Sequence, residues 1–428
     1  MRRSSARKKT DFAIIASSRV RRSRHRSSMT CRTCPAAPSC AKEPVAHAFR
    51  VFFLFAAVDA IIAVGLWLPK LLDIATGDVA GVPLAVWHRD ELLFGMMPAV
   101  LAGFVLTALP RWTRRPPVTP TTLMALAVLW VAGRVAHALP GESLHAQAWA
   151  PGVAAVFVMT LALVTARQVL ASRAWRESKI VLLLAGFAVA AGFASLHPGG
   201  ATKETAMRLG LASVLGLVVV LGGRIAPALT AAWLKARGES PPDPRRRWIE
   251  TTAALAVAAA LCAWVIAPKA GVTAVASACA FIVQTERLAR WQGWRVSDSA
   301  SILALHAAYG WIPVGFALHA AAIVWPSFVS EAAAVHAWAL GAIGLMSIAV
   351  MASMIRRHSH TPFVFSALTS ASLFCAAIAV PARTVAEVAS NGRTFWLLLS
   401  ATSWIAAFLL FLLAFRDPLL RRATWREV

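Results

Sequence analysis

The sequence predicts an all-α polytopic membrane protein with about twelve transmembrane helices. Of the 428 residues, 58% are hydrophobic and only 14% are charged, whereas soluble globular proteins are roughly 45–50% apolar and about 25% charged. Long apolar segments recur along almost the whole chain, and about 20 residues are enough for a helix to cross a bilayer. Basic residues gather in every second connection between these segments, as in a chain that crosses the membrane repeatedly.

The apolar segments define the expected helices in order along the chain. Most have roughly 17–25 residues, the length of a membrane-spanning helix. Several contain Pro or Gly, which membrane helices tolerate because neighbouring groups satisfy the freed backbone atoms. The expected spans are residues 50–68, 91–109, 120–139, 148–170, 179–197, 206–234, 248–267, 270–286, 299–325, 332–355, 362–380 and 394–415.

The residues before the first span form a segment of different character. Stretches such as "MRRSSARKKT" and "RRSRHRSS" are basic and rich in Ser, and the one apolar piece, "FAIIA", is too short for a signal-peptide core. This composition predicts a disordered tail at residues 1–46, with Met29 as an alternative start of the chain. Residues 47–428 are then the transmembrane domain.

The net charge of +24 is explained by where the basic residues lie. Of the 43 Lys and Arg, 13 lie in residues 1–50, 20 follow even-numbered spans, six follow odd-numbered spans, and four lie within spans. Basic loops that alternate with nearly neutral ones obey the positive-inside rule and predict that both termini are cytoplasmic. A nucleic-acid partner is therefore not expected, and the partner of the helical surface is membrane lipid.

Histidines fall at two expected depths in the membrane. With a helical rise of about 1.5 Å per residue, His88 lies near the depth of His336 and of His319 towards the outer face, while His306 lies near the depth of His358 towards the inner face. A neutral imidazole is an effective ligand for haem iron or copper. The alternative for any single histidine is an interfacial side chain that bonds to a carbonyl. The group of histidines favours metal binding.

Other ionisable residues fall within the spans. Asp59 lies midway along the first span, and Arg134, Arg208 and Arg224 lie within the third and sixth. Such groups are costly in a bilayer, so pairing an Asp with an Arg reduces the cost for both. We interpret them as structural clamps rather than as a transport path.

Tyr309 is the single tyrosine of the chain. It follows His306 by three residues and therefore shares its helix face. It could orient the imidazole or a ligand, or it could bond to a neighbouring helix.

Motifs of soluble enzymes and of covalent haem are not found. The sequence has no phosphate-binding Gly loop, no G-x-S-x-G, no H-E-x-x-H and no C-x-x-C-H. A covalently attached haem is therefore excluded, whereas a non-covalent haem is not.

Several motifs, in order along the chain, resemble the NnrS family. Together they cover nearly the whole chain after residue 48. They are "FRVFFLFA" at 49–56, "WHRDELLFG" at 87–95, "AGFVLTALPRWTRRPP" at 102–117, "LWVAGRVA" at 129–136, "GGRIAPALT" at 222–230, "RLARWQGWR" at 287–295, "LHAAYGWIPVG" at 305–315 and "HAWALGAIGLMSIAVM" at 336–351.

The resemblance implies a multi-span protein of the bacterial inner membrane that contains non-covalent haem, of b type, and copper. It implies a role in the response to nitric oxide, in denitrification and in resistance to nitrosative stress, with nitric oxide or metal–nitrosyl species as partners. It brings no assigned reaction. Three histidines match family histidines, and we expect them to bind the cofactors together with His88. They are His306, His336 and His358.

The motif at 87–95 carries the expected metal site and also departs from the family. The usual form is W-H-x-H-E, in which His88 and Glu91 keep their places while Asp90 replaces the second histidine. The resemblance makes His88 a metal ligand and Glu91 either the carboxylate that steadies its ring or a proton acceptor, with Asp90 beside them. Asp90 and Glu91 also fit a helix N-terminus, where acids favour the positive end of the dipole. If the second histidine binds metal in relatives, this protein holds one metal fewer.

Two functions follow from these observations. The first is a haem-binding, and also copper-binding, membrane protein of the nitric-oxide response. The second is a multi-span transporter or permease without haem, since twelve spans with a long loop at 235–247 permit two halves of six. The sequence shows no internal repeat in support of the second.

Overall fold

A computed structural model describes residues 48–71, 78–79, 82–138, 146–197, 199–242, 247–358, 366–389 and 391–420. All of them belong to one compact unit, Val45–Val428. The tail expected at residues 1–46 lies outside the described residues.

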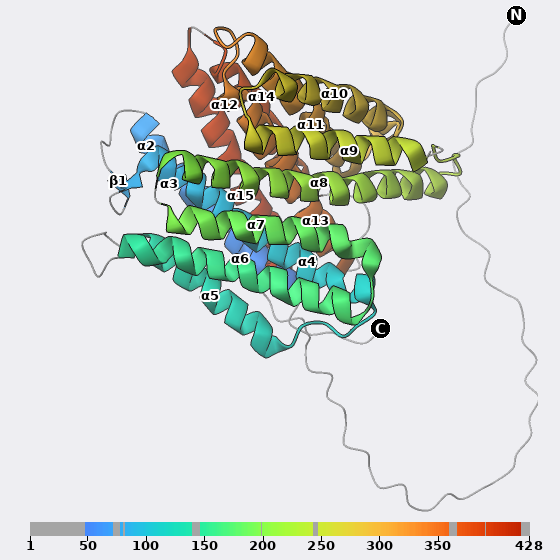
Figure 1. Ribbon diagram of the computed structural model, residues 1–428. Helices are drawn as coiled ribbons and strands as arrows, with labels where there is room; N and C mark the ends of the chain where they lie inside the picture. Colours follow the sequence, from blue (N-terminus) through green and yellow to red (C-terminus); the bar gives the residue numbers. More distant parts are fainter. Residues whose placement is uncertain are drawn as a thin grey trace, which may run out of the picture. The chain divides into compact units, whose positions relative to one another are not determined.

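The described chain is almost entirely helical, with one antiparallel pair of two-residue strands, β1 (Asp78–Val79) and β2 (Val82–Pro83) (Figure 1). The helical elements are α1 (Ala48–Gly65), α2 (Leu68–Leu71), α3 (Leu84–Glu91), η1 (Leu92–Met96), α4 (Met97–Thr113), α5 (Pro120–Ala138), α6 (Ala146–Ala171), η2 (Trp175–Glu177), α7 (Ser178–Leu196), α8 (Gly200–Ala236), α9 (Arg247–Ile266), α10 (Gly271–Ala289), η3 (Gly293–Val296), α11 (Ala300–Val324), α12 (Glu331–His336), η4 (Ala337–Leu345), α13 (Met346–His358), α14 (Ala367–Ala386) and α15 (Arg393–Leu420).

These helices confirm the all-α membrane architecture. Each of the twelve predicted segments overlaps one helix or one composite helix. Among the described residues, eleven helices are long and apolar enough to cross a membrane. The remaining predicted span, the eighth at residues 270–286, is α10, whose last turns carry Gln284, Glu286 and Arg287. These polar residues explain why α10 is less apolar than its neighbours.

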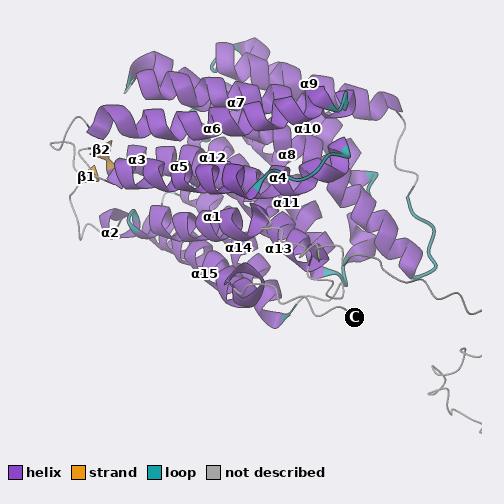
Figure 2. Ribbon diagram, turned by 90° about the horizontal axis from the view of Figure 1, so that it is seen from below, coloured by secondary structure: helices purple, strands orange, loops and turns teal. Residues whose placement is uncertain are grey.

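The first and last long helices meet at one end of the bundle. The Arg50 Nε atom, near the start of α1, donates to the carbonyl oxygen of Pro418, near the end of α15, at 2.7 Å. An even number of crossings returns a chain to its starting side, so this contact indicates that α10 crosses as well. We call the opposite end, where α1 ends and α3 begins, the pocket end. Figures 1 and 2 show α2, the two strands and α3 together there.

Neighbouring helices pack in chain order from α5 to α11, each against the next. The chain closes because α1 packs against both α4 and α15 (Figure 2). Small residues allow this close approach, and Ala56, Ala57 and Ala60 of α1 are fully buried. Small residues are the usual means of helix association in lipid, where apolar burial between helices has little driving force.

Two membrane helices are interrupted by π-helical turns. The second span consists of α3, η1 and α4, and the tenth consists of α12, η4 and α13. In both, the π-helical turn begins just after a histidine of interest, His88 in one and His336 in the other. A π-helical turn widens the helix locally and is frequent at functional sites. Both interruptions lie near the pocket end.

Candidate functional site

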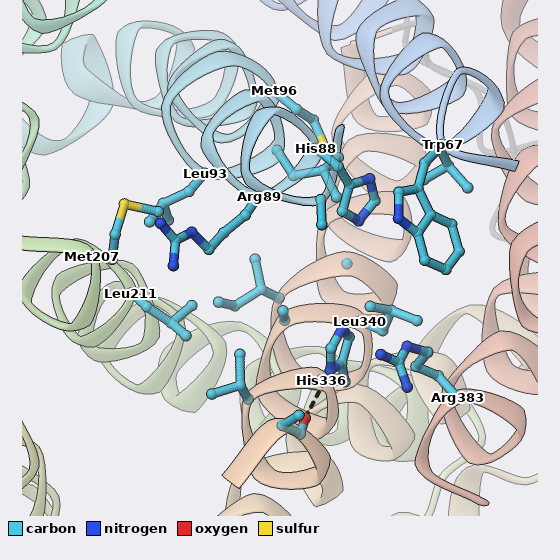
Figure 3. Close-up of a pocket in the computed structure, with 18 of the residues that line it drawn as sticks. Trp67, His88, Arg89, Leu93, Met96, Met207, Leu211, His336, Leu340 and Arg383 are labelled. Atoms are coloured by element: carbon cyan, nitrogen blue, oxygen red, sulfur yellow. Dashed lines mark hydrogen bonds between the residues drawn. The ribbon is translucent and has the colours of Figure 1, made fainter. Parts of the chain in front are cut away.

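A cavity of about 510 Å³ opens at the pocket end between α3, α8, η4, α14 and α15 (Figure 3). Cofactor sites in proteins usually have roughly 300–1,000 Å³. Most of its wall is apolar and aromatic, and Trp264 and Trp404 are part of it. The ionisable residues in the wall are His88, Arg89, Glu204, Arg208, Glu331, His336 and Arg383.

His88 enters the cavity from the last turn of α3. Its Nδ1 atom lies 3.0 Å from the carbonyl oxygen of Ala63 in α1, and its ring stacks on Trp67 with centroids 5.5 Å apart. A carbonyl oxygen only accepts, so Nδ1 carries the hydrogen. In the neutral ring, Nε2 therefore keeps a free lone pair, which is the state that a metal ion binds.

His336 enters the same cavity from the end of α12 (Figure 3). Its Nδ1 atom lies 2.7 Å from the carbonyl oxygen of Ala332 in the preceding turn. The same reasoning gives His336 a hydrogen on Nδ1 and a free lone pair on Nε2. The structure thus places in one cavity the two histidines that depth along the helices had paired, each with its Nδ1 held by a backbone carbonyl.

Three arginines line the cavity, and they differ in their partners. Arg89 pairs with Glu204 at 2.9 Å, and Arg383 pairs with Glu387 one turn along α14. Arg208 donates from Nη2 to the hydroxyl of Thr205 at 3.0 Å, and its Nε has no hydrogen-bond partner. Among the described residues no ion pair to Arg208 is found. It is therefore the cation in this wall with capacity for an anionic group.

Asp90 and Glu91 do not line the cavity. Asp90 pairs with Lys203 of α8 at 2.7 Å. Glu91 pairs with Arg134 at 3.0 Å and with His137 at 2.5 Å. The expectation that Glu91 steadies His88 is therefore wrong. Glu91 lies on the α5 side of α3, and a backbone carbonyl takes the place expected for the carboxylate.

His306 and Tyr309 lie deeper, on α11, and contact different partners. The Nε2 atom of His306 lies 2.8 Å from the hydroxyl of Thr230. The hydroxyl of Tyr309 donates to Gln284 at 2.8 Å and accepts from Arg287. The expected contact between Tyr309 and the imidazole is not formed. Tyr309 instead joins α11 to α10, in agreement with the alternative prediction that it bonds to a neighbouring helix.

His358 and His319 do not join His306 or the cavity. His358, at the end of α13, donates to the carbonyl of Met354 at 2.9 Å and packs on Phe49 of α1. His306 faces α8, so the expected lower pair of His306 with His358 has no contact to support it in the described part of the chain. His319 is 1% exposed and bonds to Ser277 at 3.0 Å.

The remaining intramembrane charges pair as clamps. Arg224 of α8 pairs with Glu177 at 2.5 Å, between α7 and α8. Asp59 lies beside Arg134, as a pairing of acid with arginine predicts, but Glu91 is also a neighbour. This part of the structure is therefore a cluster of acids and bases and not a simple pair.

A comparison with protein families now bears on these residues. The NnrS protein family model matches residues 44–422, which is most of the chain. The chain belongs to the NnrS protein family. A search of curated proteins finds no match. The matched region of this NnrS protein contains both composite helices and every residue of the cavity wall.

Sequence reasoning missed several residues of the NnrS cavity. From the sequence, Arg208 is expected to be a structural clamp, and Arg383 is one of the six basic residues that follow odd-numbered spans. Met96, Met97 and Met207 were not singled out, since single methionines in apolar helices carry no signal. Among the described residues, no group of three His, Cys, Asp or Glu side chains lies close enough to hold a metal ion. The imidazoles in the cavity wall are those of His88 and His336.

Proposed function

We propose that the cavity binds haem through His88 and His336, and that the protein acts in the bacterial response to nitric oxide and nitrosative stress. The observation that carries the proposal is the pair of imidazoles in one apolar cavity, each with a hydrogen on Nδ1 and a free Nε2. His88 and His336 would hold the iron of a non-covalent haem through these nitrogens. Family membership supports the physiological role.

The rest of the wall fits the same group. Haem has an apolar macrocycle and two carboxylates, and the wall offers apolar side chains together with Arg208, whose Nε is without a partner. The carbonyls of Ala63 and Ala332 orient the two rings, in the way that ligand histidines are commonly held by a bond to the other nitrogen. The iron would supply a centre for binding nitric oxide or exchanging electrons.

The decisive measurement is the optical spectrum and haem content of protein purified in detergent. We expect a Soret band in the wild type. The band should be lost in His88→Ala and in His336→Ala, because each substitution removes one imidazole that would hold the iron. His306→Ala and His358→Ala are matched controls, since neither residue lines the cavity. Both controls should keep the haem content of the wild type at normal membrane yield.

Three results would contradict the proposal. Colourless wild-type protein from haem-replete cells would favour a transporter without haem. Full haem in both His88→Ala and His336→Ala would remove these residues as ligands. Equal loss of haem in all four variants would show a general response to substitution rather than loss of a ligand.

Copper is a second candidate for the same cavity because three thioethers line it. Met96, Met97 and Met207 are in the wall with the two imidazoles, and soft sulfur ligands select copper(I). Metal analysis of the same samples separates the cases. Copper that is lost with Met207→Leu and retained in His306→Ala would place copper in this cavity, whereas equal copper in every sample would exclude it.

A further inference from the structure

A buried cluster of two acids and two bases lies on the other side of α3 from the cavity. It contains Asp59 of α1, Glu91 of α3, and Arg134 and His137 of α5. Asp59 is 4% and Glu91 is 3% exposed. None of the four lines the cavity, and Glu91 is three residues beyond His88.

Glu91 is the centre of the cluster. Its Oε1 lies 3.0 Å from Nη1 of Arg134, and its Oε2 lies 2.5 Å from Nδ1 of His137. The carboxyl of Asp59 is within hydrogen-bonding reach of Glu91 and close to Arg134. One oxygen of Asp59, Oδ2, is buried without a hydrogen-bond partner. The charged groups that interact with Asp59 are Glu91 and Arg134, and those that interact with Glu91 are Asp59, Arg134 and His137.

Close packing of α1, η1 and α5 surrounds the cluster. Gly95 of η1 has no side chain, and a methyl group there would lie 2.9 Å from Oδ2 of Asp59 and would overlap the guanidinium of Arg134. The indole of Trp130 donates to the carbonyl of Gly95 at 2.9 Å. From α15, Trp404 reaches the same stretch of α1 by donating to the carbonyl of Ala60 at 3.1 Å.

The charges of the cluster do not balance unless it holds a proton. With His137 neutral, two carboxylates and one guanidinium leave one net negative charge in a buried site, which is costly. Two carboxyl groups approach within hydrogen-bonding distance when one of them is protonated, since two ionised ones repel. One added proton makes the cluster neutral. It resides either on the Asp59–Glu91 pair or on His137.

We propose that Asp59, Glu91, Arg134 and His137 form a proton-binding site that holds one exchangeable proton, with His137 as its connection to the pocket end. His137 is one residue before the end of α5 and is partly exposed, whereas both acids are buried. A proton leaving the His137 imidazolium would pass to the Glu91 carboxylate and from there to Asp59, which leaves a neutral imidazole, an ionised Glu91 and a carboxylic acid on Asp59. The total number of protons is unchanged in this step.

Infrared difference spectroscopy of the purified protein tests the proposal whether or not haem is bound. We expect a carboxylic-acid band at neutral pH that shifts in D₂O, and its loss in Asp59→Asn. Asp298→Asn is the matched control, because a hydrogen bond from Arg237 lowers the pKa of Asp298 and keeps this exposed carboxyl ionised. That variant should retain the band. His137→Gln should retain the band, because the proton then has no imidazole to occupy.

Stability gives an independent readout. If Asp59 is an ionised partner of Arg134, Asp59→Asn should lower the melting temperature. If Asp59 is protonated, replacing it by a neutral amide should leave the melting temperature unchanged or raise it. The proposal is overturned by wild-type protein without a carboxylic-acid band between about pH 5 and 9, by a band unchanged in Asp59→Asn, or by a lowered melting temperature in that variant.

Discussion

At Gly95, η1 lies close against two neighbouring helices. The Gly95 backbone lies against Arg134 of α5 and Asp59 of α1, and its carbonyl accepts from Trp130. Any side chain here would collide with charged groups whose positions are set by one another. A single glycine thus allows a buried polar cluster to form between helices that otherwise pack through apolar residues.

We expect Gly95→Ala to destabilise the protein by about 1–3 kcal/mol, the usual cost of overpacking. The methyl group would displace Arg134 from Glu91, because it overlaps the guanidinium. Thermal unfolding in detergent measures the effect. Gly192→Ala is the control, since a methyl group there meets no atom within 4 Å, and removing a glycine from a helix interior is usually favourable. Equal melting temperatures for the two variants would refute the role given to Gly95.

Backbone carbonyls perform at His88 and His336 the function that carboxylates perform at many metal sites. A carbonyl fixes the hydrogen on Nδ1 without adding a charge. In an apolar cavity this avoids burying a second ionised group. Glu91 is thereby free to pair with α5.

Composite helices carry both histidines of the cavity. In each, a short α-helix ends near the histidine and a π-helical turn follows. A π-helical turn shifts the residues after it around the helix axis, so the histidine and the next turns of the same span can face different neighbours. In the second span these later residues are Leu92–Met96 and α4, whereas His88 and Glu91 both precede the turn, in α3.

The short helix α12 depends on its cap. The Ser330 hydroxyl accepts from the backbone N–H of Ala333 at 3.3 Å and donates to Glu387 at 3.2 Å. We expect Ser330→Ala to cost about 1 kcal/mol of stability, as loss of an N-cap usually does, and to weaken haem retention because α12 ends at His336. Haem content after dilution in detergent is the measurement.

Ser366→Ala is the matched control for this cap. Ser366 caps α14 in the same way, through the N–H of Thr369 at 3.3 Å, but α14 carries no imidazole of the cavity. A similar loss of stability without loss of haem is expected. Haem loss of the same size in both variants would show that the cap of α12 has no special effect on the site.

The whole helical unit closes on itself, because α1 packs between α4 and α15. The bond from Arg50 to Pro418 places the first and last helix ends together. That contact, rather than the apolar character of α10, is the reason to count twelve crossings. The cavity lies at the opposite end from this contact.

We expect reporter fusions after Gly141 and after Gly238 to report opposite sides of the membrane. The positive-inside rule predicts that Gly141 is outside and Gly238 inside. Phosphatase activity and fluorescence of the fused reporters are the measurements. The reverse result would place the cavity on the cytoplasmic side and both termini outside, without changing the fold.

Apolar length and charge alternation are local properties of the chain, and they were enough to predict the twelve helices and the all-α membrane architecture. Helical rise was enough to pair His88 with His336 in depth. The direction in which a side chain points depends on the rotation of its helix about the helix axis and on the π-helical turns that interrupt the helix. The π-helical turns change this direction for the residues that follow them, and no local pattern signals this. Glu91 contacts α5, Tyr309 contacts α10, and His306 and His358 face different helices because packing between distant segments sets these partners.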